Sequence, residues 1–168
     1  FLVGVSFGPM PPYSAQEAKF LHAAWTSALL TSLALGMVGL RGLLGFTGMG
    51  KRPIRLLGRM LWMSVAGMAL LTFLPGVTLR HALGGALYGA GYAMTHTLIF
   101  MVIIDRSRPD RRGAAVGALY FAYDAGQAVG AFLLGQAMEG IGRHWGLAAG
   151  YRWGWALGGL ALAGCLLL

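Results

Sequence analysis

The segment "GALYFAYDAGQAVGAFLLG", residues 117–135, is long and apolar and carries one carboxylate, Asp124, near its middle. A helix that crosses the hydrocarbon core of a bilayer needs about 20 apolar residues. The stretch around Asp124 that holds no other charge runs from residue 113 to residue 138, which is long enough. Asp124 lies roughly 16 Å beyond Gly113 along a helix. The pattern therefore predicts a membrane helix with an acid at mid-depth.

The composition of the whole chain agrees with a membrane environment. Of its 168 residues, 57% are hydrophobic and only 11% are charged, whereas soluble domains carry about 25% charged residues. The 28 glycines suit membrane helices, because small residues let helix backbones approach closely. We therefore predict an all-α fold, a polytopic bundle of transmembrane helices.

Apolar runs recur along the chain and predict a series of spans. We expect a single bundle over residues 1–168, which begins on Phe1 and stops inside an apolar run, so we expect it to be truncated at both ends. The predicted spans are residues 1–13 (a partial span ended by prolines), 20–44, 60–79, 82–104, 113–138 and 153–168.

Basic residues between the spans predict the orientation. Loops 45–59 and 105–112, with Arg41 just before the first, hold nine Lys or Arg residues, and the opposite side holds four. Cytoplasmic loops carry the excess of Lys and Arg. We therefore expect a multi-pass protein of the plasma (inner) membrane with both loops and both chain ends in the cytoplasm. The four residues expected outside are Lys19, Arg80, Arg143 and Arg152.

Asp124 is the leading candidate for function. An ionised side chain at the bilayer centre costs roughly 3 kcal/mol on insertion scales, so it faces a partner or water rather than lipid. Tyr120 and Gln127 share its helical face, and Tyr123 is adjacent in sequence. One interpretation is a polar patch on a substrate pathway with a proton or cation site. The other is a structural hydrogen bond to a neighbouring helix.

His96 is the second titratable group inside a predicted span. It follows Tyr92 by four positions, so the two residues lie on one helical face. A histidine there can contact a substrate or relay protons, and it can equally be a packing residue with its hydrogen bonds satisfied.

Four pairs of glycines recur at the spacing GxxxG, which forms a flat groove for another helix in an apolar environment. The pairs are Gly85 and Gly89, Gly113 and Gly117, Gly126 and Gly130, and Gly154 and Gly158. We expect them to pack helices together, and the alternative is that they let helices slide.

Several classes of function receive no support. The single cysteine, Cys165, offers neither an internal disulfide nor a metal cluster. We find no HExxH or GxSxG motif, so we expect no enzyme, no catalytic residues, no metal and no cofactor. The net charge of +8 is divided between short loops without interleaved aromatic residues, which argues against nucleic acid as a partner.

The order of spans and loops resembles the C-terminal half of a major facilitator superfamily transporter, of the efflux type. The segment around Pro109, Arg112 and Gly113 is similar to the loop of that family between its tenth and eleventh spans. Residues 123–130, "YDAGQAVG", resemble the form YDxGxxxG of the eleventh span. The segment "RGLLGFTGMGKR", residues 41–52, is similar to the loop between the eighth and ninth spans, but lacks its acidic residue.

The resemblance implies a secondary active transporter that moves a small organic solute by alternating access, with proton-coupled export. The implied partners are the solute, H⁺, the lipid bilayer and the N-terminal half of the same transporter. Asp124, Tyr120, Gln127, Tyr123, His96 and Tyr92 would line the pathway, and Arg41, Lys51, Arg52, Arg106 and Arg112 would edge the cytoplasmic gate. The alternative is a non-transporting scaffold or a half-size relative that needs a partner.

Overall fold

The computed structural model describes residues 1–47 and 53–167, and every regular element in these ranges is helical. The predicted all-α class is therefore confirmed for the described residues. The elements are α1 (Leu2–Phe7), α2 (Met10–Phe20), α3 (Ala28–Thr47), α4 (Pro53–Phe73), α5 (Val77–Arg106), the 3-10 helix η2 (Pro109–Arg111), α6 (Arg112–Trp145) and α7 (Leu147–Gly164).

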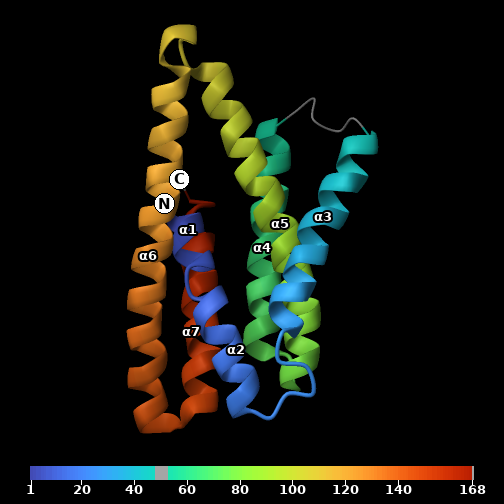
Figure 1. The fold of residues 1–168 in the computed structure, drawn as a ribbon, viewed down its shortest axis with the longest axis vertical. Helices are drawn as coiled ribbons and strands as arrows, with labels where there is room; N and C mark the ends of the chain where they lie inside the picture. The colour runs from blue at the N-terminus through green and yellow to red at the C-terminus, as the bar shows by residue number, and fades with distance from the viewer. Residues whose placement is uncertain (48–52, 168) are drawn as a thin grey trace.

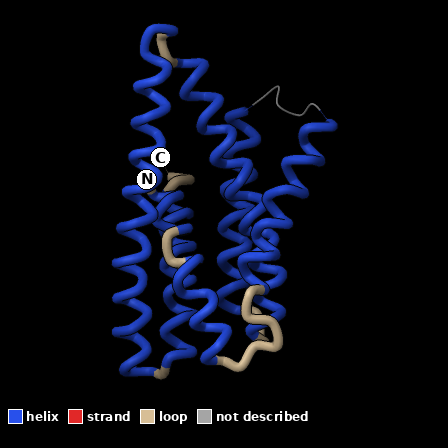
Figure 2. The backbone as a smooth tube through the Cα atoms, in the orientation of Figure 1, coloured by secondary structure: helices blue, strands red, loops and turns tan. Residues whose placement is uncertain are grey.

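The helices form an antiparallel bundle, and the connections between the long helices lie at its two ends (Figures 1 and 2). The end of α3, the start of α4 and η2 lie at one end, which we call the η2 end. The α2–α3 connection and the α4–α5 and α6–α7 turns lie at the other, which we call the α6–α7 end. The described residues of the predicted loops 45–59 and 105–112 therefore belong to the same end of the molecule.

Among the described residues, α3, α4 and α5 are long and apolar enough to cross a membrane. Their spanning segments are Ala28–Gly45, Arg55–Phe73 and Val77–Arg106. These helices support the prediction of a membrane protein. The spans expected at residues 1–13, 113–138 and 153–168 do not belong to this apolar group and stay predictions.

The prolines near the N-terminus lie at the junction of two helices, α1 and α2. Gly8 and Pro9 keep right-handed helical backbone angles between α1 and α2, and Pro11 lies in the first turn of α2. Proline is tolerated in a first turn because the amide hydrogens there have no partner within the helix. The first helix does end just before Gly8 and Pro9, but Pro11 and Pro12 belong to a second helix, α2, which runs from Met10 to Phe20.

Two tight turns differ from the predicted boundaries. The chain reverses between α4 and α5 at residues 74–76, and Gly76 has a φ of 77°, which glycine adopts without strain. Gly146, with a φ of 91°, joins α6 to α7 directly. Because α5 begins at Val77, Arg80 and His81 lie inside a helix and are buried, which corrects the expectation that Arg80 lies in an outer loop.

Glycine pairs let the backbones of two helices pack directly against the backbones of their neighbours. A methyl group on Gly126 or Gly130 of α6 would overlap a backbone carbonyl of α1, and one on Gly89 of α5 would overlap the Leu33 carbonyl of α3. The predicted packing role of these glycines is confirmed at α1–α6 and α3–α5. By contrast, Gly113 and Gly117 have no neighbour within 4 Å of such a methyl group.

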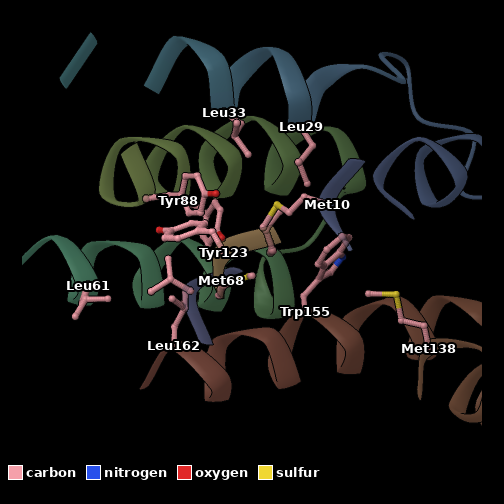
Figure 3. Packing of buried hydrophobic residues seen from close by; sticks show 13 residues of the cluster. Met10, Leu29, Leu33, Leu61, Met68, Tyr88, Tyr123, Met138, Trp155 and Leu162 are labelled. Carbon is pink, nitrogen blue, oxygen red and sulfur yellow. The ribbon is translucent and has the colours of Figure 1, made fainter. Parts of the chain in front are cut away.

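The buried core lies where the seven helices α1 to α7 converge, and Figure 3 shows part of it. Met10 of α2, Met68 of α4, Tyr88 of α5, Tyr123 of α6 and Trp155 of α7 are buried in it, together with residues of α1 and α3.

The helix contacts repeat in a pattern that exchanges the two halves of the chain. Helices α1 and α2 pack on α6 and α7, just as α5 packs on α3 and α4. Helix α4 also contacts α7. Exchanging α1–α2 with α5, α3 with α6 and α4 with α7 converts the α1–α6 contact into the α3–α5 contact and the α1–α7 contact into the α4–α5 contact, and it leaves the α4–α7 contact in place. The exchanged helices also run in opposite directions (Figure 1). The packing of α6 on α7 has no comparable counterpart between the described residues of α3 and α4, so the exchange relates only part of the bundle.

Candidate functional site

Four of the six predicted pathway residues meet where α5 faces α6. The ring centroid of His96 lies 4.6 Å from that of Tyr123 and 5.8 Å from that of Tyr120. Tyr92 lies 6.1 Å from Tyr123, edge to face. Tilted and edge-to-face arrangements are favoured by the ring quadrupoles. We call Tyr92, His96, Tyr120 and Tyr123 the α5–α6 aromatic group.

This group runs from a buried base to an exposed rim. Tyr92 and Tyr123 are buried, His96 is half-buried and Tyr120 is 46% exposed. Phe7 stacks on Tyr92 at 4.6 Å and closes the inner side. The buried Tyr123 hydroxyl has no hydrogen-bond partner among the described residues. The buried part of the group therefore contains one hydroxyl, that of Tyr123, whose hydrogen bonds no described residue satisfies.

Asp124 lies next to the aromatic group, and it is exposed in the bundle. It directly follows Tyr123 in α6, and its charge acts on Tyr92 of α5. Gln127, one turn further along, is half-buried, and its backbone contacts Gly8. No structural hydrogen bond of Asp124 to another described residue supports the alternative interpretation of this acid.

Arg41 supplies the opposite charge on the other side of the same group. It lies within the apolar part of α3 rather than in a loop, and its guanidinium donates a hydrogen bond of 3.2 Å to the Ala93 carbonyl of α5. Its charge acts on both Tyr92 and His96. Arg41 therefore lies inside a candidate span and beside the aromatic group, and its role at the edge of a gate stays a prediction.

Of the remaining predicted gate residues, the two that the structure describes do not join this site. Arg106 is the last residue of α5 and Arg112 is the first residue of α6, both exposed at the η2 end. Lys51 and Arg52 lie outside the described residues.

A second polar site, which the sequence interpretation missed, is buried between α2, α5 and α7. Glu17 is fully buried and forms an ion pair with Arg80 through Oε1. Its Oε2 accepts from the Trp155 indole at 2.9 Å and lies 2.8 Å from Nε2 of His81. We call Glu17, Arg80, His81 and Trp155 the Glu17 cluster.

A signal for the Glu17 cluster was present in the sequence. Glu17 is the one acid among the first 104 residues of the chain. A buried carboxylate needs a cationic or hydrogen-bonding partner. The adjacent Arg80 and His81 provide that partner, but the predicted span boundaries assigned both segments to connections.

Neither site has the side chains of a metal centre. Among the described residues, no group of three or more His, Cys, Asp or Glu side chains converges. Ser64, which could serve as a nucleophile in a different arrangement, donates to the Met60 carbonyl within its own helix.

Comparison of the chain with known protein families, curated proteins and solved structures found no match.

Proposed function

We propose that the bundle is the C-terminal half of a secondary active transporter of the major facilitator type. In this proposal it exports a small organic solute by alternating access, coupled to protons. In the same proposal, α1 and α2 together form one span, and α6 and α7 span the membrane beside α3, α4 and α5. The η2 end and both chain ends lie in the cytoplasm.

The observation that carries the proposal is the exposed carboxylate of Asp124 at mid-length of α6. A charge at this depth is too costly to face lipid. Because the bundle leaves it exposed, the carboxylate must face water or a second bundle. A pathway between two bundles provides both.

The partial inverted relation between α1–α4 and α5–α7 supports the same proposal. Transporters of this type contain two inverted three-helix repeats within each six-helix half, and substrates bind near the membrane midplane. In this chain, the α5–α6 aromatic group lies at the centre of α5 and is flanked by Asp124 on α6 and Arg41 on α3. A cation and an anion on either side of aromatic rings suit a solute that carries both polar and apolar parts.

The test is export of small organic compounds from cells that express the complete gene, followed by uptake into inverted vesicles under an imposed pH gradient. Asp124→Asn removes the charge at nearly constant volume. A hydrogen bond to a charged group is worth about 1.5–3 kcal/mol, so we expect the initial rate to fall about 10- to 100-fold. The pH dependence of transport should be lost with it.

The matched control is Asp110→Asn. Asp110 is an exposed acid of η2, paired with Arg108 and outside both polar sites, and we expect its replacement to leave transport intact. If Asp124→Asn and a Tyr120→Phe/Gln127→Ala double variant both transport with unchanged pH dependence, the proposed pathway is wrong. A complete gene product that transports nothing would favour the non-transporting scaffold.

A further inference from the structure

The Glu17 cluster satisfies its charges only when His81 is neutral. The carboxylate of Glu17 and the guanidinium of Arg80 cancel, and both are at least 98% buried. His81 is fully buried, and its Nε2 lies at hydrogen-bond distance from the ionised Glu17, so Nε2 carries the hydrogen and donates. In this neutral tautomer, Nδ1 bears a free lone pair.

That lone pair has no hydrogen-bond partner among the described residues. Nδ1 of His81 is therefore the basic atom of the cluster that is available to bind a proton. The Ser32 hydroxyl of α3 is engaged elsewhere, with the backbone carbonyls of His81 and Leu29. The arrangement can therefore accept one proton at Nδ1 without displacing a donor that is already bound.

Two pockets reach residues of the cluster or side chains next to it. A pocket of about 510 Å³ at the α6–α7 end is lined by Arg80 itself, together with Arg152 and Trp145. A second pocket, of about 210 Å³, is lined by Tyr13 and Tyr151. The Tyr151 side chain of this second pocket is close enough to Glu17 to interact with it electrostatically.

We infer that the Glu17 cluster is a proton-binding site, loaded from the α6–α7 end of the bundle. A proton from bulk water forms an N–H bond with Nδ1 of His81, and no other bond is made or broken. The loaded cluster carries one net positive charge. Several kcal/mol are lost when an uncompensated charge is kept in a dry interior, so the proton is held when α2, α5 and α7 separate enough to admit water.

The charged and titratable groups around His81 come from each neighbouring helix. Beside Glu17 and Arg80 they are Tyr13 of α2, Tyr151 and Arg152 of α7, and Glu139 of α6, which lines the smaller pocket. The described titratable residues of α4, Arg55 and Arg59, lie near the start of that helix, towards the opposite end. Among the described side chains, Glu17 alone is in hydrogen-bond contact with the His81 ring.

The role of this site in transport rests on the proposed function, because it would make the Glu17 cluster the point where protons enter from outside. Loading would then open the α6–α7 end, and closure of that end would release the proton. Binding of the proton itself can be measured without any transport.

The experiment uses Trp155, whose indole donates to the same carboxylate, as a reporter. Fluorescence of the complete purified protein is titrated from about pH 5 to about pH 8, the range in which histidine changes charge. The Trp155→Phe variant is subtracted to isolate the signal of Trp155. We expect a single-proton transition, lost in His81→Gln and retained in Asp124→Asn, which removes the transport site instead.

A flat difference signal over this range, or an unchanged transition in His81→Gln, overturns the inference. Should His81→Gln not fold, labelling of Ala149→Cys, in the larger pocket, replaces it after Cys165→Ala. Its rate relative to the exposed His144→Cys must rise on acidification, and a constant ratio refutes opening. If transport fails in the wild type while the transition of Trp155 persists, the proposed function fails and the proton site stands.

Discussion

Replacement of Gly130 by alanine tests whether α1 packs on α6 through a glycine face. The added methyl group would overlap the carbonyl group of Val5, which is backbone and cannot rotate away, so α1 must shift. Overpacking of this kind costs about 1–3 kcal/mol. Gly117→Ala is the matched control, since it lies on the same helix, gains the same helix propensity and meets nothing within 4 Å.

The gain in helix propensity cancels in the comparison, and the difference between the two variants is the packing cost alone. We expect Gly130→Ala to be less stable than Gly117→Ala by about 1–3 kcal/mol. The assay is unfolding of the purified protein in mixed micelles by titration with sodium dodecyl sulfate. Equal stability of the two variants would refute the close approach of α1 to α6.

Two further predictions concern a hydrogen bond and the orientation. The Ser6 hydroxyl donates to the Val3 carbonyl and lies 2.8 Å from the buried Tyr88 hydroxyl. Ser6→Ala therefore leaves Tyr88 unsatisfied, at a cost of about 1–3 kcal/mol, in the same unfolding assay. Adding Tyr88→Phe should recover part of this loss, and full additivity would contradict the bond. The orientation is tested in a Cys165→Ala background with reagents that do not cross the membrane. The exposed position Asp110→Cys should react only from the cytoplasm, and His144→Cys only from outside. Reaction of both positions from one side excludes the proposed orientation.

Part of the α5–α6 site could be predicted from spacing, because its members form two sets that each lie on one helix. Residues four apart share a helical face, so Tyr92 and His96 were linked to each other, and Tyr120 to Asp124, without knowledge of the fold. The contact between these two helices, with His96 against Tyr123, depends on how α5 and α6 pack. The family resemblance implied that Arg41 lies at a gate, whereas its hydrogen bond to α5 depends on the position of α3.

The apolar runs and the low fraction of charge determined by themselves that this chain is a bundle of helices suited to a membrane. Hydrophobicity is a local property, and helix hydrogen bonds close within a few residues. The four GxxxG pairs, in contrast, read alike, and only packing distinguishes Gly130, pressed against Val5, from Gly117, which faces open space. The Glu17 cluster joins residues 63 to 138 positions apart. Such contacts depend on which helix faces which, and that choice is made only when the whole chain packs.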